Sequence, residues 1–283
     1  MYERFYGFHE KPFSMLPDPQ FLYPSRKHQL ALAQLEYGLW NQASFSVVTG
    51  GIGAGKTTLI RYLLRQLESD VVVGLISNTH PSFGELLHWI LNAFNLDYSS
   101  SEKVGLYRVF ADFLIEQYAN NRRTVLIIDE AQNMTRDTLE ELRLLSNINS
   151  EKDQVLQIIL SGQVGLRKLL RDPALEQFAQ RIAVDYHLEP LDETETCNYI
   201  RHRLSIAGGS PDLFDEEACK TIYKYSGGTP RLINILSDTA LVYGFSLHAE
   251  KIDNNLAEEV GRDKKKSGIL PMHRETYHSN KTG

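Results

Sequence analysis

The feature that most constrains this chain is a glycine-rich stretch between two apolar runs, VVTGGIGAGKTTLI at residues 47–60. It fits the pattern G-x-x-x-x-G-K-[ST] and lies between a predicted strand and a predicted helix. Glycines let such a loop curl with its N–H groups pointing inward, which makes a nest for an anion, and the positive end of the following helix adds to it. The pattern predicts a loop that binds the phosphates of a nucleotide. Its residues are Gly50, Gly51, Ile52, Gly53, Ala54, Gly55, Lys56, Thr57 and Thr58.

Two residues of this loop carry specific chemistry. We expect Lys56 to reach the β- and γ-phosphates, where its positive charge also serves catalysis, and Thr57 to ligate Mg²⁺. A glycine-rich turn that binds nothing is the alternative. The neighbouring strand and helix make it the weaker interpretation.

The remaining pattern alternates strands and helices up to about residue 190 and is helical afterwards. Near-continuous apolar strands separated by amphipathic helices are typical of a parallel sheet covered on both faces. We therefore predict an α/β fold with a five-stranded parallel sheet, followed by a small all-helical domain. The predicted strands are 45–50, 71–77, 124–130, 155–162 and 182–188, and the predicted late helices are 193–207, 215–226, 230–246 and 253–262.

A pair of acidic residues follows the third predicted strand, in TVLIIDEAQNM. Open α/β sheets bind their ligands at the carboxyl ends of the strands, which is where Asp129 and Glu130 are expected. Asp129 can hold Mg²⁺ through water, and Glu130 can orient and polarise an attacking water molecule. Acidic residues often only end a strand, but this pair follows a good phosphate loop, so we predict hydrolysis of a nucleoside triphosphate.

Further polar residues fit the same site. Ser161 and Gln163 end the fourth predicted strand, from which either could sense the γ-phosphate. In SGGTPRLINIL, two glycines end one helix and Pro230 begins the next. Arg231 then lies where the helical domain could bring a guanidinium group to the phosphates. Satisfied backbone groups at a strand end and an exposed first-turn arginine are the ordinary alternatives.

Composition and charge limit the cellular setting and the partners. No apolar run approaches the roughly 18 residues of a membrane helix, and two cysteines make no disulfide framework, so a cytoplasmic protein without a transmembrane segment is expected. The net charge is −6, although residues 261–283 hold six Lys or Arg against two Asp or Glu. This composition does not favour generic binding of nucleic acid. The C-terminal segment 263–283 is predicted to be a flexible basic tail.

These motifs, in this order, resemble the AAA+ ATPases. The phosphate loop, LIIDE, the polar strand end, QRI and GGTPR carry the resemblance, which covers nearly the whole chain to about residue 262. The opening segment FYGFHEKPFSMLPDPQFLYPSRKHQLALAQLEYGL is similar to the ExeA/GspA-type secretion ATPases. The pilus-biogenesis relative MshM and the TniB/TnsC transposition ATPases are related. The resemblance implies four parts: an N-terminal collar on the nucleotide site (1–40), the ATPase core (41–190), a helical lid (191–262) and the tail.

The resemblance also implies an assembly, because AAA+ proteins bind ATP at subunit interfaces. Arg181 lies where relatives carry the arginine that a neighbouring subunit supplies, and Arg231 would act within its own subunit. A homo-oligomer is implied, as a hexameric ring or a helical filament. In the collar, Phe13, Tyr23 and His28 are candidates to cover the nucleotide base, or are ordinary packing residues.

Three functions remain open from the sequence. The first is an ATP-driven assembly factor for a secretion or pilus system, working through protein partners at the inner face of the membrane. The second is a DNA-associated ATPase of the transposition type that forms ATP-dependent oligomers on duplex DNA. Its phosphate contacts would come from the tail and from Arg122, Arg123, Lys168 and Arg171. The third is a slow, nucleotide-gated switch that partners recognise by its shape.

Overall fold

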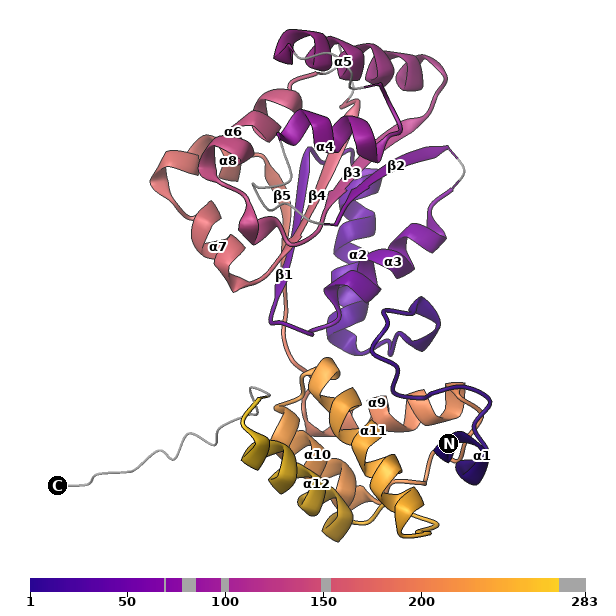
Figure 1. Ribbon diagram of the computed structural model, residues 1–283. Helices are drawn as coiled ribbons and strands as arrows, with labels where there is room; N and C mark the ends of the chain where they lie inside the picture. The colour runs from indigo at the N-terminus through magenta and orange to yellow at the C-terminus, as the bar shows by residue number, and fades with distance from the viewer. Residues whose placement is uncertain (69, 78–84, 98–101, 149–153, 270–283) are drawn as a thin grey trace, which may run out of the picture. The chain divides into compact units, whose positions relative to one another are not determined.

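The computed structural model describes residues 1–68, 70–77, 85–97, 102–148 and 154–269 (Figure 1). The chain divides into two compact units. One comprises Met1–Ser25, Gly53–Gly55 and Glu189–Gly283, and the other comprises Arg26–Ile52 and Lys56–Leu188. We call them the helical unit and the sheet unit.

The sheet unit is built on a parallel sheet, which confirms the predicted fold class. Among the described residues the sheet has five strands in the order β2-β3-β4-β1-β5, and every neighbouring pair is parallel. This order places β4 between β3 and β1, so the segments that follow these three strands lie at the same edge of the sheet. The strands are β1 (Phe45–Gly50), β2 (Val71–Ile76), β3 (Arg123–Ile128), β4 (Leu156–Gly162) and β5 (Ile182–Leu188).

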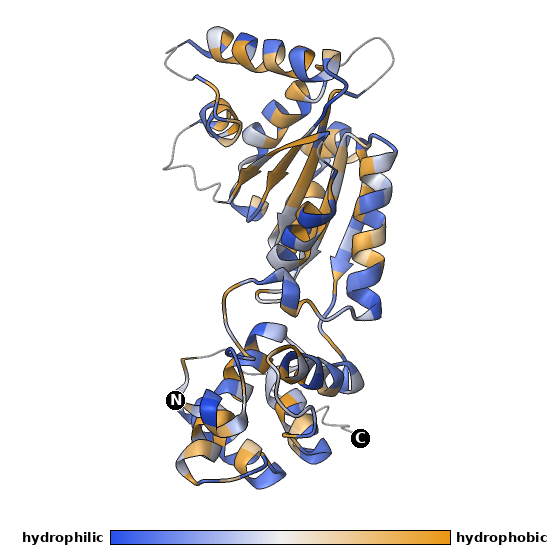
Figure 2. Ribbon diagram, turned by 90° about the vertical axis from the view of Figure 1, so that its right-hand side faces the viewer, coloured by the Kyte–Doolittle hydropathy of each residue, from blue (hydrophilic) through white to orange (hydrophobic). Residues whose placement is uncertain are grey.

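Helices enclose the apolar strands, as Figure 2 shows. Strands β1 and β4 are buried along their whole length, which explains their continuous apolar sequences. Helices α2 and α3 contact β1, while α4 contacts β2 and α5 contacts β3. The helices of this unit are α2 (Arg26–Trp40), α3 (Lys56–Gln66), α4 (Leu86–Ala93), α5 (Lys103–Ala119), α6 (Arg136–Leu145), α7 (Val164–Leu170) and α8 (Glu176–Ala179), with 3₁₀ turns η3 (Ala131–Asn133) and η4 (Pro173–Leu175).

The helical unit has its own apolar core, in which the N-terminal segment takes part. Tyr2, Phe8, Phe13 and Phe21 are buried in one cluster with the apolar faces of the late helices. Asp192 and Glu195 form a capping box that fixes where the first late helix begins. The elements are α1 (Tyr2–Tyr6), η1 (Pro19–Phe21), α9 (Glu193–Ile206), α10 (Glu216–Ser226), α11 (Pro230–Ser246) and α12 (Asn254–Ser267).

Two predicted boundaries differ from the structure. Helix α12 continues to Ser267, so residues 263–267 are helical and not part of a flexible tail. Lysine is a good helix former, and Lys264, Lys265 and Lys266 lie in the last turn, where cations complement the helix dipole. The predicted collar 1–40 is also divided, because α2 packs on the sheet while residues 1–25 belong to the helical unit. Residues 270–283 of the predicted tail lie outside the described residues.

Candidate functional site

The phosphate loop connects β1 to α3 as the sequence predicts. Gly53 and Gly55 have φ angles of +75° and +98°, a left-handed conformation that residues with a side chain rarely adopt. The Lys56 ammonium group lies against the loop and donates hydrogen bonds to the carbonyl oxygens of Gly50 (3.1 Å) and Gly51 (3.0 Å). Lys56 begins α3 and is buried, with 6% of its surface exposed. The structure therefore places the Lys56 ammonium group against the loop that is predicted to bind phosphates.

The environment of Lys56 has opposing effects on its charge. Burial lowers the pKa of the Lys56 ammonium group, and the carboxylates of Glu130 and Asp129 act in the opposite direction, with a net lowering. An anion bound beside Lys56 would favour the charged form, so its arrival would offset the cost of burying this charge.

Asp129 lies at the centre of a hydrogen-bonded cluster. The Thr57 hydroxyl donates to Asp129 Oδ2 at 2.7 Å, and the Ser161 hydroxyl donates to Asp129 Oδ1, also at 2.7 Å. The three side chains come from α3, the end of β3 and β4, which the strand order brings together. Asp129 and Ser161 are buried. Ser161 thus contacts the acidic residue directly, a role that the sequence analysis did not assign to it.

Thr57 and Asp129 fit a magnesium ion. A hydroxyl and a carboxylate are the hard oxygen ligands that Mg²⁺ prefers, and this pair lies within 2.7 Å. In the part of the chain that the structure describes, no group of three or more His, Cys, Asp or Glu side chains could hold a metal by itself. Mg²⁺ commonly binds one or two protein ligands together with water and substrate phosphates, so a site of this composition suits it.

Glu130 is held in an unusual conformation beside Asp129. Its φ angle is +53°, in the left-handed region that a residue with a side chain seldom adopts. Two glutamine amides, of Gln132 and Gln163, donate to the same carboxylate oxygen, Glu130 Oε2. Gln163 therefore contacts Glu130 in this structure. The sequence did not predict a role for Gln132, and only its position two residues after Glu130 could have indicated a contact between them.

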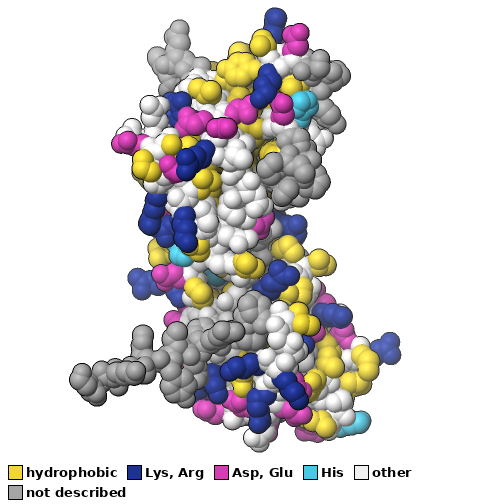
Figure 3. Space-filling model, turned by 60° about the vertical axis from the view of Figure 1, so that its left-hand side comes forward, with side chains coloured by type: hydrophobic (Ala, Val, Ile, Leu, Met, Phe, Trp, Pro, Cys, Tyr) yellow, Lys and Arg dark blue, Asp and Glu magenta, His cyan; other side chains and the backbone are white. Residues whose placement is uncertain are grey.

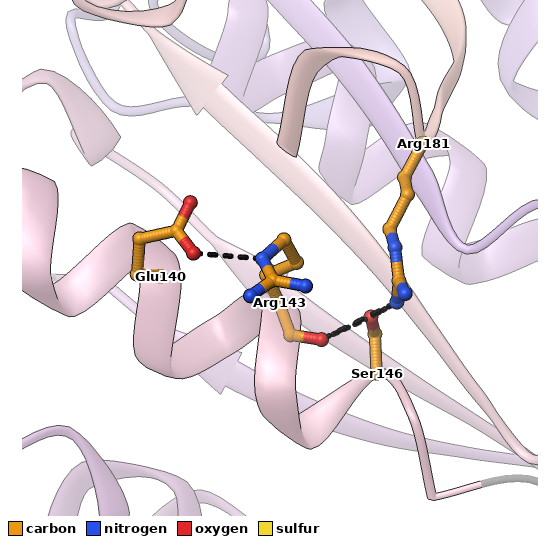
Figure 4. Close-up of polar contacts among 4 residues, drawn as sticks. All are labelled: Glu140, Arg143, Ser146 and Arg181. Carbon is orange, nitrogen blue, oxygen red and sulfur yellow. Dashed lines mark hydrogen bonds and ion pairs between the residues drawn. The ribbon is translucent and has the colours of Figure 1, made fainter. Parts of the chain in front are cut away.

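Arg181 lies immediately before β5 and binds the end of α6 (Figure 4). Its guanidinium group donates to the Ser146 hydroxyl at 2.9 Å and to the Arg143 carbonyl at 3.4 Å. The last carbonyls of a helix lack partners within it and attract cations. Arg143 itself pairs with Glu140 at 2.7 Å. Ser146 and Arg143 carried no signal in the sequence that linked them to Arg181.

The start of α11 holds the remaining predicted residues. Gly227 and Gly228 have positive φ angles, Thr229 precedes the helix, and Pro230 is its first residue, as predicted. Arg231 follows in the first turn and is exposed. Its approach to the phosphates stays a prediction.

The three collar candidates lie in two different environments. Phe13 is buried and packs edge-on against Phe214, with ring centroids 6.0 Å apart, which supports the packing interpretation for this residue. Tyr23 packs against Tyr199 in the same unit. His28 is buried within α2 of the sheet unit.

Comparison of the sequence with protein families and known proteins finds two relationships. Residues 40–170 match a family described as the AAA domain. The chain is 40% identical over 253 residues to General secretion pathway protein A of Aeromonas hydrophila. That match covers 89% of this chain but 46% of the relative, so the chain spans about half the length of that protein.

Solved structures with similar folds include two proteins of Aeropyrum pernix and one of Thermotoga maritima. The Aeropyrum pernix ORC2 protein, in ADPNP–ADP complexes, matches with a TM-score of 0.66 and 15% identity over 93% of this chain and 75% of its own. The Aeropyrum pernix ORC1 protein in complex with DNA matches with a TM-score of 0.64 and 17% identity, over 91% of this chain and 70% of its own. The Thermotoga maritima RuvB Holliday junction branch migration motor matches with a TM-score of 0.55 and 18% identity, over 86% of this chain and 70% of its own. At these identities the matches establish the shared fold.

Of the helices within the described ranges, none has both the length and the apolar character to cross a bilayer.

Proposed function

We propose that the chain is an AAA ATPase that binds ATP with Mg²⁺ and hydrolyses it, because residues 40–170 match the AAA domain and most of the chain is related to General secretion pathway protein A. The observation that carries the proposal is the gathering of Lys56, Thr57, Asp129 and Glu130 at one edge of the sheet. The hydrogen bond between Thr57 and Asp129 and the charge interactions among Lys56, Asp129 and Glu130 join these four residues.

Each residue has a distinct role in the proposed reaction. The loop Gly50–Gly55 surrounds the phosphates with N–H groups, and Lys56 exchanges its bonds to the Gly50 and Gly51 carbonyls for the β- and γ-phosphates. Thr57 and Asp129 would hold Mg²⁺, which would supply positive charge beside the phosphate oxygens. Glu130 orients the attacking water and accepts its proton. Ser161 keeps the Asp129 carboxylate in place.

We further propose that ATP is hydrolysed between subunits of a homo-oligomer, either a hexameric ring or a helical filament. Arg181 would then approach the γ-phosphate of the neighbouring subunit and stabilise the charge of the transition state. Arg231, in the lid 191–262, would contact the phosphates of its own subunit. The core 41–190 would carry out hydrolysis, and the N-terminal collar 1–40 would cover the nucleotide site.

For the biological role, we propose assembly of a secretion or pilus system through protein partners. The identity to General secretion pathway protein A supports this role. We place the protein in the cytoplasm, peripheral to the inner face of the membrane.

A DNA-associated ATPase is the second candidate, because a solved structure with this fold, the ORC1 protein, was determined in complex with DNA. One of the candidate basic residues, Arg123, weakens this alternative. Arg123 pairs with Asp70 and lies over the Trp40 ring, so its charge is engaged within the sheet unit. Figure 3 shows basic side chains interspersed with acidic and apolar ones on the face in view.

Steady-state ATP hydrolysis at low salt, with and without duplex DNA, separates the two candidates. Turnover that is indifferent to DNA is expected for the assembly factor. Stimulation by DNA that decreases as salt is added would instead support the DNA-associated ATPase, because contacts with DNA phosphates release counterions and therefore weaken at higher salt. In the same assay Glu130→Gln should bind ATP with little turnover, and normal turnover of that variant would overturn the role of Glu130.

A further inference from the structure

We infer that Gln132 is a positioning residue for Glu130, which it holds in the direction needed for hydrolysis. This inference rests on the proposed function, in which Glu130 activates the water. Gln132 forms a bridge with two ends. Its amide nitrogen donates to Glu130 Oε2, and its amide oxygen accepts the backbone N–H of Gln163 at 2.8 Å.

The bridge determines which way the amide of Gln132 points. A backbone N–H can only donate, so the group that faces Gln163 N must be the oxygen of Gln132. The NH₂ group of the same amide must then face Glu130. A flipped amide would set NH₂ against N–H at one end and oxygen against a carboxylate at the other, which is unfavourable at both.

A second amide reinforces the same arrangement. The Gln163 side-chain nitrogen donates to Glu130 Oε2 at 3.0 Å, so this oxygen accepts from both glutamines. Glu130 and Gln132 follow β3, and Gln163 follows β4, so the bonds fix the carboxylate against two neighbouring strands. The backbone of Glu130 is itself in the left-handed region, a conformation that the surrounding contacts must maintain.

The backbone beside the Gln132 amide, at Gly162, has no room for a side chain. A Cβ atom added to Gly162 would lie 2.9 Å from Gln132 Oε1 and 2.8 Å from a methyl carbon of Leu166. Glycine at the end of β4 therefore allows the Gln132 amide to reach the backbone of Gln163. This close fit distinguishes Gln132 from a surface glutamine that contacts a carboxylate incidentally.

The consequence for catalysis follows from preorganisation. A glutamate side chain has many rotamers, and a general base acts efficiently only when it is within hydrogen-bond reach of the proton that it accepts. Removal of the Gln132 donor should leave nucleotide binding intact, because Gln132 contacts neither Lys56 nor Thr57 in any described hydrogen bond. Removal should lower turnover, because Glu130 would spend less time in the productive direction.

Gln132→Met tests this inference, since methionine has a similar length and no amide. We expect kcat to fall about 10-fold, the usual scale for partners that orient a functional group, with an unchanged Kd for MgATP. Gln132→Glu keeps an oxygen for Gln163 N–H but loses the donor toward Glu130, and kcat should fall at least as far. Gln34→Met, on the exposed side of α2, is the matched control and should retain normal turnover.

A double-mutant comparison distinguishes positioning from a general structural effect. In Glu130→Asp the shorter side chain withdraws the carboxylate from the amide, so adding Gln132→Met should cost little further turnover. An equal further loss in that background would overturn the inference, as would wild-type kcat in Gln132→Met or Gln132→Glu. If Glu130→Gln itself hydrolyses ATP normally, the proposed role of Glu130 fails instead.

Discussion

Lys56 combines burial, positive charge and carbonyl partners that a triphosphate can replace. The ammonium group donates hydrogen bonds to two carbonyl oxygens of the loop, those of Gly50 and Gly51, and its burial lowers its pKa. A buried charge of this kind is costly unless it is paired. At the scale of single residues, the loop is therefore arranged for an anion that would complete the pairing.

We predict that Lys56→Ala loses ATP binding. Hydrogen bonds to charged groups contribute about 1.5–3 kcal/mol each, and Lys56 is expected to make at least one to each of two phosphates, so affinity should fall at least about 100-fold. Isothermal titration calorimetry with MgATP measures this loss. Lys168→Ala, an exposed lysine of α7, is the control and should bind ATP normally. Retained affinity in Lys56→Ala would place the phosphates elsewhere.

At the scale of elements, the junction between α10 and α11 depends on one glycine. Gly228 has a φ angle of +73°, and a Cβ atom there would lie 1.8 Å from the Leu191 carbonyl oxygen. Leu191 also donates its N–H to the Gly228 carbonyl at 2.9 Å. The start of α11, which presents Arg231, is thus tied to the segment that leads into α9.

We expect Gly228→Ala to destabilise the protein by about 3 kcal/mol, because it adds a steric clash with backbone to left-handed strain. Urea denaturation monitored by circular dichroism measures the change. Gly7→Ala is the matched control, since its φ angle is +76° but its Cβ would meet nothing within 4 Å. The control should cost about 1 kcal/mol from strain alone. Equal effects of the two substitutions would show that the contact with Leu191 adds nothing.

Elements were more predictable from the sequence than contacts between them. Continuous apolar runs fixed the five strands to within two residues, and the phosphate loop lies where its glycines and Lys56 indicated. The contacts of Gln132 and Ser146 could not be predicted, because they depend on which strands are neighbours. Ser161 was predicted as a polar strand end, but its bond to Asp129 follows from β4 lying beside β3. The prediction of a tail from residue 263 is wrong for residues 263–267, because a run of charged residues resembles a solvated tail while its lysines favour a helix.

At the scale of the whole molecule, the question is whether one subunit completes the site of another. Within its own subunit Arg181 binds Ser146 and the Arg143 carbonyl at the end of α6. These bonds hold the side chain in place before β5. In the proposed oligomer the same guanidinium group serves the neighbouring γ-phosphate, so Arg181 and Glu130 of one chain would act in different sites.

Mixing two inactive variants tests this arrangement directly. Arg181→Ala should bind ATP but turn over about 1,000-fold more slowly, because a trans arginine contributes roughly 10³–10⁵ in rate, and Glu130→Gln should also be nearly inactive. When the two are mixed, a site that takes Arg181 from a Glu130→Gln subunit and Glu130 from an Arg181→Ala subunit is complete. Turnover should therefore reappear and reach its maximum near equal proportions.

Arg143→Ala, which keeps the backbone carbonyl that Arg181 contacts, is the control and should stay within about 2-fold of normal. If the mixture stays inactive while it forms mixed oligomers, Arg181 acts within its own subunit, and normal turnover of Arg181→Ala alone would remove it from the mechanism.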